Sequence, residues 1–147
     1  MRNAIGKARQ AQLPRGARGI VLGADTFLCF RGHIIGKPKT LAEARRILTA
    51  LSGTNHWVYT GLCLRDIASG KERIGYVKTS VRFRHLSSET ITRLLARMAP
   101  LDKAGGYAIQ KDRGELIAKI EGSRSNVIGL PMELLRRELA LLRACAS

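Results

Sequence analysis

Residues 77–84 alternate strictly between two kinds of side chain, and this alternation constrains the fold more than any composition does. One set is mainly apolar and the other mainly basic: Val77, Thr79, Val81 and Phe83, against Lys78, Ser80, Arg82 and Arg84. Because successive side chains of a β-strand point to opposite faces, the pattern predicts a strand with one face buried in a sheet. The basic face can bind a polyanion, but we favour a sheet face in contact with water.

Shorter apolar runs between glycines or polar turns predict the other strands. We expect strands at residues 19–24, 27–30, 33–35, 57–64, 74–84 and 116–120. The first is apolar throughout, a pattern typical of a strand buried on both faces. Arg31-Gly32 is expected to close a tight hairpin.

Helices are expected where apolar residues recur at helical spacing. They should cover residues 2–12, the segment from Thr40 to Gly53, the segment from Ser87 or Ser88 to Pro100, and a last helix opened by Pro131. Thr40 and Glu43 fit a capping box. The last helix is expected to bury Met132, Leu135, Leu139 and Leu142. With no internal repeat and no linker, the order of elements predicts one α/β domain over residues 1–147.

The balance of basic and acidic residues indicates which kind of ligand the protein binds. Of the 147 residues, 26 are Lys or Arg and 11 are Asp or Glu, which gives a formal net charge of +15. The basic residues are dispersed, and this favours a polyanionic ligand such as a nucleotide, a nucleic acid or an acidic surface over a basic tail. Nucleic-acid binding as the main role is not expected, because aromatic residues are not interleaved with basic ones along the chain as a stacking platform requires.

Cysteine usage and hydropathy indicate the compartment. Cys29, Cys63 and Cys145 are widely spaced, which is typical of reduced thiols and not of a disulfide framework or a zinc site. No run approaches the roughly 18 apolar residues of a membrane span, and the basic start lacks the apolar stretch of a signal peptide. We therefore expect a cytoplasmic protein without a membrane segment, although an Arg-rich, acid-free start also fits an organellar transit peptide.

Asp25-Thr26 directly follows the strand predicted at residues 19–24. Ligands of α/β sheets bind beyond the carboxyl ends of strands, where a carboxylate can hold a metal ion or activate water. The alternative is an aspartate that only forms a turn. The dipeptide alone leaves both interpretations open.

Lys37 lies in a segment, residues 32–38, that resembles a phosphate-binding loop but departs from its pattern. Three residues separate the glycines instead of four, and Pro38 stands where Ser or Thr is required. Since a residue before proline is pushed out of the helical region, Lys37 is either a point charge reached from an extended segment or an ordinary surface lysine.

Two later segments are rich in glycine and small polar residues. Gly105-Gly106 allows either close approach of the backbone to a ligand or merely a tight turn. Gln110 can read the edge of a base, because its amide both donates and accepts hydrogen bonds. The amides of residues 122–131, together with the start of the last helix, can hold an anion.

Six short blocks occur in a fixed order along the chain. They are Gly23-Ala24-Asp25-Thr26, Gly36-Lys37-Pro38, Leu51-Ser52-Gly53 with His56, Thr60-Gly61, Asp102-Lys103-Ala104-Gly105-Gly106-Tyr107 with Gln110, and Asn126-Val127-Ile128-Gly129-Leu130-Pro131. In this order they resemble the Maf family of septum-formation inhibitor-like proteins, which are nucleoside triphosphate pyrophosphatases. The resemblance implies a curved mixed sheet flanked by helices, as in Maf and inosine-triphosphatase-like folds.

The resemblance also implies a role for particular residues. Asp25 matches the family's proton acceptor and would help to hold a divalent cation, Mg²⁺ or Mn²⁺. Lys37 matches the phosphate site, and Lys7 of Lys7-Ala8 matches a lysine of the preceding helix. Thr26 and Gln110 match the branch that acts on dTTP and UTP. The implied reaction is hydrolysis of a pyrimidine nucleoside triphosphate to the monophosphate and pyrophosphate, by a protein that is usually a homodimer.

Three departures from the family pattern affect these expectations. Family members begin with a strand and a Ser-x-Ser-Pro-Arg-Arg loop that this chain does not match, so we expect a first strand-loop-helix unit, on the order of 30–40 residues, to be missing. Lys111 replaces a usual glycine, and Arg124 replaces a usual aromatic residue. The missing loop would supply an arginine to the triphosphate. The alternative function is therefore a catalytically impaired Maf-like remnant that binds nucleotides or nucleic acid without cleaving them.

Overall fold

The computed structural model describes residues 1–144 as an α/β fold built on a five-stranded sheet in the order β2-β1-β3-β4-β5. The strands are β1 (Ile20–Phe30), β2 (His33–Ile35), β3 (Asn55–Asp66), β4 (Glu72–Phe83) and β5 (Ile117–Glu121). The predicted α/β class with flanking helices is confirmed, but the expectation of a mixed sheet was wrong, since within residues 1–144 every strand pair is antiparallel. Cys145 lies outside the described residues.

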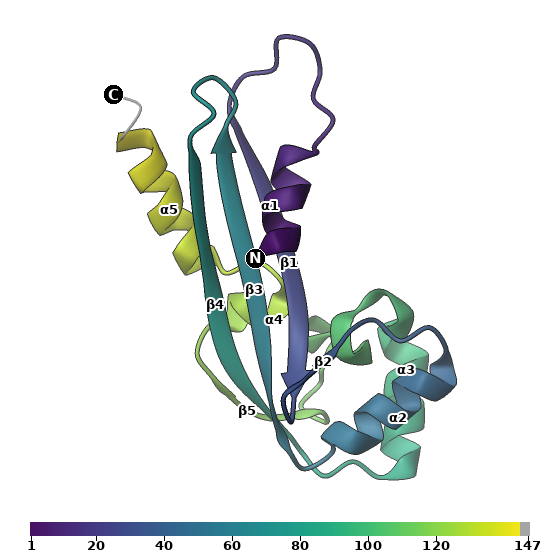
Figure 1. Ribbon diagram of the computed structural model, residues 1–147. Helices are drawn as coiled ribbons and strands as arrows, with labels where there is room; N and C mark the ends of the chain where they lie inside the picture. Colours follow the sequence, from purple (N-terminus) through teal and green to yellow (C-terminus); the bar gives the residue numbers. More distant parts are fainter. Residues whose placement is uncertain (145–147) are drawn as a thin grey trace.

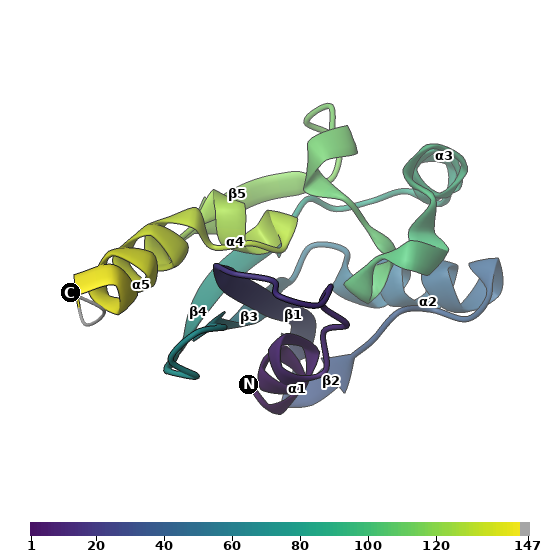
Figure 2. The ribbon, with the colours of Figure 1, turned by 90° about the horizontal axis from the view of Figure 1, so that it is seen from above.

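Helices lie on both sides of this sheet (Figures 1 and 2). They are α1 (Arg2–Arg9), α2 (Leu41–Leu51), α3 (Ser88–Met98), α4 (Arg124–Ile128) and α5 (Met132–Ala144). Helix α1 lies on one face, while α4 and α5 lie on the opposite face, and α2 and α3 gather at one end of the long strands. Three short 3₁₀ turns between residues 100 and 111 follow α3, and we call this stretch the 3₁₀ segment. Among the described helices, none is both long and apolar enough to cross a membrane.

The alternating pattern that dominates the sequence forms β4 as predicted. Val81 and Phe83 are fully buried, together with Thr79, whereas Lys78 and Arg82 on the opposite face are exposed. The buried side faces a core shared with α2, α3 and the 3₁₀ segment. One face of the β-strand therefore builds the core, and the basic face lies in solvent.

Strand β1 differs from its prediction in length and in burial. It runs without interruption from Ile20 to Phe30, because it pairs with β3 from Ile20 to Cys29. Leu22 is 41% exposed, so this strand is not buried on both faces. Within the described structure, β2 pairs only with the last three residues of β1 and leaves the remainder of that edge open. As a result Asp25 lies in the middle of the strand and not beyond its end.

Helix α1 packs unusually closely on β1. A Cβ atom added to Gly23 would collide with the carbonyl oxygen of Ala4 and lie 2.8 Å from the backbone nitrogen of Ala8. Ala4 and Ala8 are both buried, and they form a small cluster with Cys63 of β3. The absence of a side chain at Gly23 therefore lets the helix backbone rest directly on the sheet.

The prediction for the inner face of α5 is confirmed in part, because Leu142 is buried and Leu135 and Leu139 pack partly buried against the core. The buried residues are Leu134, Glu138 and Leu142, whereas Met132 is 37% exposed. Glu138 is buried because Arg73 of β4 reaches it, with Nε donating to Oε2 at 2.9 Å. A carboxylate that forms such a pair can occupy the centre of a helix face that periodicity assigns to apolar residues.

Both predicted helix caps are present. The Thr40 hydroxyl accepts a hydrogen bond from the Glu43 amide at 3.1 Å, and Ser87 caps α3 through the Thr90 amide at 3.2 Å. The return contact of the capping box shifts by one residue, since the Glu43 carboxylate accepts from the Lys39 amide at 2.7 Å. These caps fix where α2 and α3 begin.

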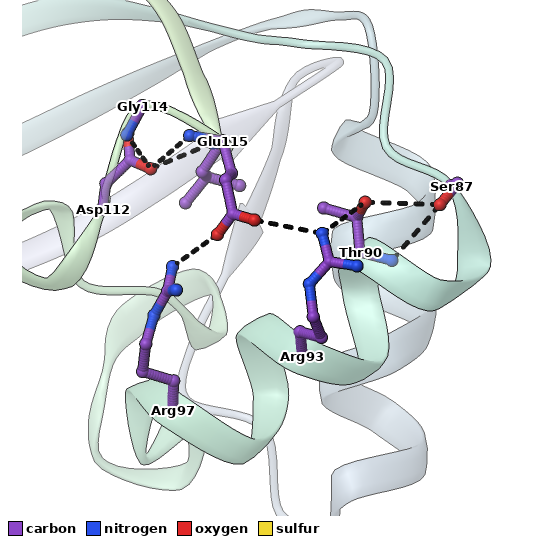
Figure 3. Close-up of polar contacts among 8 residues, drawn as sticks. Ser87, Thr90, Arg93, Arg97, Asp112, Gly114 and Glu115 are labelled. Carbon is purple, nitrogen blue, oxygen red and sulfur yellow. Dashed lines mark hydrogen bonds and ion pairs between the residues drawn. The ribbon is translucent and has the colours of Figure 1, made fainter.

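A set of polar contacts anchors the chain to α3 just after the 3₁₀ segment (Figure 3). Glu115 pairs with Arg93 at 3.0 Å and with Arg97 at 2.9 Å. The Asp112 carboxylate accepts hydrogen bonds from the backbone amides of residues 114–117. The segment is thereby held at its exit, where the chain enters β5.

Candidate active site

A cleft of about 490 Å³ opens beside the uncovered stretch of β1. Its walls come from α1, β1, the segment after β2, the 3₁₀ segment and the end of α4. All five residues singled out from the sequence line it: Lys7, Asp25, Thr26, Lys37 and Gln110. Residues more than 100 positions apart in the chain thus meet around one cavity.

Asp25 is held at this cleft by two donors from α1. Lys7 Nζ lies 2.7 Å from Asp25 Oδ1 and also donates to the carbonyl oxygen of Ala24 at 2.9 Å. Asn3 Nδ2 donates to Asp25 Oδ2 at 3.0 Å. Partial burial by itself raises the pKa of Asp25, but the hydrogen bonds from Lys7 and Asn3 and the lysine charge outweigh it and lower the pKa. The carboxylate is therefore ionised at neutral pH.

Lys37 reaches the cleft from the exposed stretch after β2. Pro38 next to it is buried, and the amide of Gly105 donates to the carbonyl oxygen of Gly36 at 3.0 Å. These two contacts hold the backbone while the side chain stays in solvent. No hydrogen bond or ion pair joins Lys37 to another of the residues 1–144. Its charge is therefore available to an anion in the cleft.

Gly105 shows why the glycine pair is needed. Both glycines have positive φ, and a Cβ atom on Gly105 would lie 2.6 Å from Leu28 Cδ1. The close approach that glycine permits at this position is an approach to β1. It brings the 3₁₀ segment against the strand that bears Asp25.

Tyr107 fixes the remainder of the 3₁₀ segment in the core. Its hydroxyl lies 2.8 Å from Nε2 of His56, and both rings pack edge-to-face on Phe83. Burial lowers the pKa of His56 to about 4 and raises the pKa of Tyr107. Both side chains are consequently neutral, and they serve as a support from which Gln110 extends, exposed, into the cleft.

Thr26 belongs to a chain of hydroxyl contacts that crosses the sheet. Its Oγ1 atom lies 2.8 Å from Oγ1 of Thr60, directly opposite on β3, and 3.4 Å from the carbonyl oxygen of Gly129. Thr60 in turn donates to the carbonyl oxygen of Asn126 at 3.2 Å. Asn126 is fully buried and donates to Val58 and to Thr79.

The segment at residues 122–131 contains the short helix α4 instead of an open loop. Ser123 and Ser125 both donate to Glu133 at the start of α5, at 3.0 and 2.8 Å. The start of that helix therefore holds a carboxylate of the protein itself. What the segment gives to the cleft is its end, Val127, Ile128 and Gly129.

Sequence reasoning assigned no role to several residues that support the site. Asn3 was overlooked. Thr60, His56 and Asn126 were quoted as members of short motifs, without a structural or functional role. The available signal was their place in those motifs, since a small or polar residue within an apolar strand often has a buried partner.

The fold and the cleft define an α/β domain in which three lysines and two aspartates surround a site for a charged ligand. The chain belongs to the Maf-like protein family, whose model matches residues 1–142.

Three relatives show the extent of the similarity. The dTTP/UTP pyrophosphatase of Desulfitobacterium hafniense (strain Y51) is 48% identical over 122 residues, which is 83% of this chain and 54% of the relative. That of Anaeromyxobacter sp. (strain Fw109-5) is 48% identical over 125 residues, or 80% of this chain and 61% of the relative. That of Geotalea uraniireducens (strain Rf4) is 45% identical over 136 residues, which is 90% of this chain and 68% of the relative. The chain thus spans between about half and two thirds of these proteins.

Proposed function

We propose that this chain is a pyrophosphatase domain that hydrolyses dTTP and UTP to the monophosphate and pyrophosphate. The observation that supports it most is the convergence of Lys7, Asp25, Thr26, Lys37 and Gln110 on one cleft. The relatives named dTTP/UTP pyrophosphatase, 42–48% identical to this chain, support the same reaction.

In the proposed reaction, Asp25 accepts a proton from water. The water oxygen then bonds to the α-phosphorus, the bridge between the α- and β-phosphates breaks, and pyrophosphate leaves with the bridging oxygen. Asp25 is available for this role because the hydrogen bonds that lower its pKa keep it ionised at neutral pH and hold it at the cleft. General-base help of this kind is typically worth about 10²–10⁴-fold in rate.

The two lysines beside the carboxylate have separate tasks. Lys7 is bound to Asp25 at 2.7 Å, so it orients the base and keeps it ionised. Lys37 has no partner among residues 1–144, and its ammonium would pair with a phosphate oxygen. Thr26 and Gln110, which also line the cleft, would contact the nucleobase.

A divalent cation fits this site only in part. Asp25 offers a hard oxygen ligand that is 24% exposed, but residues 1–144 contain no cluster of three His, Cys, Asp or Glu side chains. Mg²⁺ commonly binds through one or two carboxylates, with substrate phosphates and water completing its shell. We infer that Asp25 would hold Mg²⁺ or Mn²⁺ together with the triphosphate. When bound, such a cation neutralises charge on the phosphate oxygens.

The direct test measures pyrophosphate release from dTTP, UTP, CTP and GTP with Mg²⁺ or Mn²⁺. The proposal expects release from dTTP and UTP, and a loss of at least about 100-fold in Asp25→Asn. Asp66→Asn is the matched control, because Asp66 lies at the end of β3 and outside the residues that line the cleft. A folded protein that cleaves none of the four nucleotides would contradict the proposal.

The second candidate is a module that binds nucleotides or single-stranded nucleic acid without cleavage. One observation favours it: on the sheet face beside α1, Lys78 lies 3.7 Å from the Trp57 ring centroid and 5.7 Å from that of Tyr59. Tyr59 stacks on Phe27 at 5.1 Å. Aromatic and basic side chains that are separate in the sequence thus lie together on the sheet. Binding of an oligonucleotide without pyrophosphate release would favour this candidate.

The homodimer that the resemblance implies, and a place in the cytoplasm, are likewise proposals. Light scattering of the purified chain would measure the first. Fractionation of cells that express it would measure the second.

A further inference from the structure

Helix α1 covers only part of the sheet face on which it lies (Figure 1). The helix begins over Gly61 of β3, where an added Cβ atom would lie 3.3 Å from Met1. From Gly61 onwards the same face carries aromatic and basic side chains on three adjacent strands: Phe27 of β1, Trp57 and Tyr59 of β3, and Tyr76, Lys78 and Arg82 of β4. We call these six residues the aromatic face.

Two rings of the aromatic face are largely in solvent. Trp57 is 41% exposed and Tyr76 is 59% exposed. Phe27 and Tyr59 lie opposite each other in the sheet and stack at 5.1 Å, and both are half-buried. Exposed rings that lie close together favour a ligand with flat apolar surfaces of its own.

The charges beside these rings are positive. The Lys78 ammonium lies 3.7 Å from the Trp57 ring centroid, and Arg82 is exposed further along β4. Two carboxylates on the same side of the sheet, Asp25 and Glu121, are each paired with a lysine. Rings beside cations suit a single strand of nucleic acid, because its bases stack on aromatic side chains and its phosphates carry negative charge.

The contact between Lys78 and Trp57 does not close the site. A cation–π contact at an exposed position is weak, so a phosphate can draw the ammonium away and leave the ring to a base. The net charge of +15 acts in the same direction, because it attracts a polyanion to the protein. The aromatic face therefore has both of the contacts that a single strand requires.

Phe27 connects the aromatic face with the cleft. It lines the cleft and at the same time stacks on Tyr59. Asp25 lies two residues before Phe27, and alternate residues of a strand share a face. A strand of nucleic acid that crosses the aromatic face therefore reaches the cleft beside the proposed general base.

We propose that the aromatic face binds a single strand of nucleic acid whose 5′-triphosphate lies in the cleft. The inference rests on the proposed function, because it takes the cleft as the place where pyrophosphate is released. The water oxygen bonds to the α-phosphorus of the first nucleotide, and the water proton passes to Asp25. Pyrophosphate leaves with the bridging oxygen, and the strand keeps a 5′-monophosphate. The substrate class then includes triphosphate ends of nucleic acid strands besides free nucleotides.

The first test measures binding. Trp57 is the only tryptophan of the chain, so its fluorescence reports directly on the aromatic face. The probes are oligouridylates of about ten nucleotides with a 5′-triphosphate or a 5′-hydroxyl, in the presence of a chelator that prevents cleavage. We expect both to change the fluorescence, and the triphosphate strand to bind at least about tenfold more tightly. Unchanged fluorescence, or equal affinity for the two strands, would overturn the inference.

The second test removes one ring or one charge and follows a labelled triphosphate strand by anisotropy. Trp57→Leu should weaken binding at least about fivefold. Lys78→Gln should lower the slope of log affinity against log salt concentration by about 0.7, the value of one phosphate contact. Arg136→Gln is the matched control, because it removes one charge from an exposed position of α5, on the opposite side of the sheet. An equal effect of the control and Lys78→Gln would overturn the inference.

Pyrophosphate release separates this inference from the proposed function. With Mg²⁺ we expect release from the triphosphate strand as well as from UTP, and Trp57→Leu should raise KM for the strand at least about fivefold more than KM for UTP. Tighter binding of the triphosphate strand without release from either compound would sink the proposed reaction and keep the binding site. Release from UTP by a protein that binds no strand would keep the reaction and sink the inference. Self-association that is lost in Trp57→Leu, without strand binding, would instead assign the aromatic face to a second copy of the chain.

Discussion

Lys7 of α1 and Asp25 of β1 form an ion pair of 2.7 Å at the rim of the cleft. The lysine is 57% exposed and the carboxylate 24% exposed, so water screens the pair and its contribution to stability is small. The ion pair matters for two other reasons. It holds α1 against β1, and it lowers the pKa of Asp25.

Replacing Lys7 with Met should move the acid limb of the pH–rate profile to higher pH. The pKa of Asp25 is lowered because hydrogen bonds from Lys7 and Asn3 outweigh the effect of burial. Without Lys7 the pKa rises, so that protonation removes the base at a higher pH. The measurement is kcat/KM for UTP across the acid range.

Arg9→Met is the matched control for this variant. Arg9 lies on the same helix with similar exposure, but it pairs with Glu72 at 2.6 Å, away from the cleft. The Arg9→Met variant should leave the acid limb of the pH–rate profile at the wild-type pH. If the two variants shift the profile equally, the effect belongs to overall charge and not to the Lys7–Asp25 pair.

Gly23→Ala should detach α1 from β1 and lower activity. The new methyl group would collide with Ala4 and Ala8, and the helix can relieve the collision only by moving away with Lys7 and Asn3. Gly6→Ala provides the comparison, since a Cβ atom there meets nothing within 4 Å. In the interior of a helix that change stabilises by roughly 0.5–1 kcal/mol. Kinetics and thermal melting of both variants check the prediction, which fails if Gly23→Ala keeps full activity.

The folded protein should lose stability as the pH falls below neutral. Burial lowers the pKa of His56 from 6.5 to about 4, so the unfolded chain binds a proton that the folded protein excludes. The stabilisation is complete above pH 6.5 and decreases as the pH falls towards 4. Between pH 7.5 and pH 5 the free energy of unfolding should decrease by about 2 kcal/mol from this group.

Urea unfolding at these two pH values measures the effect. His56→Gln should show a smaller decrease than the wild type, whereas substitution of the exposed His33 by Gln should show the same decrease. A wild-type free energy that is flat between the two pH values would refute the assignment.

Glu115→Gln should loosen the 3₁₀ segment. It weakens two ion pairs to α3, and that helix holds the segment which supplies Tyr107 and Gln110 (Figure 3). We expect faster limited proteolysis within residues 100–115 and a higher KM with kcat nearly unchanged. Glu121→Gln is the control, because Glu121 pairs with the exposed Lys119 of its own strand β5. Equal protease resistance in the two variants would show that the anchor is dispensable.

Local patterns in the sequence predicted most of the helices and strands, because the spacing of apolar residues within a segment is enough to distinguish a helix from a strand. They failed where a distant partner decides burial. Glu138 occupies the buried face of α5 because Arg73, 65 positions away, pairs with it. Asp25 lies within a strand because β3 continues to pair with β1 beyond residue 24.

The meeting of the site residues at one cleft was predicted by the order of sequence motifs and not by the physical chemistry of each residue. Asp25, Thr26 and Lys37 each had an ordinary structural interpretation, and only the order of the short blocks set that interpretation aside. The hydroxyl chain from Thr26 through Thr60 was out of reach, because a cross-strand contact depends on register, and a shift of one residue would separate the pair.

The position of Asp25 inside a paired strand has an evolutionary consequence. Its backbone lies opposite Gly61 in the sheet, whereas Lys37 and Gln110 belong to stretches outside the strands. Substitutions in those stretches can change which ligand is held while the proposed general base keeps its place. A lineage built on this scaffold can therefore diversify its substrates without rebuilding its chemistry.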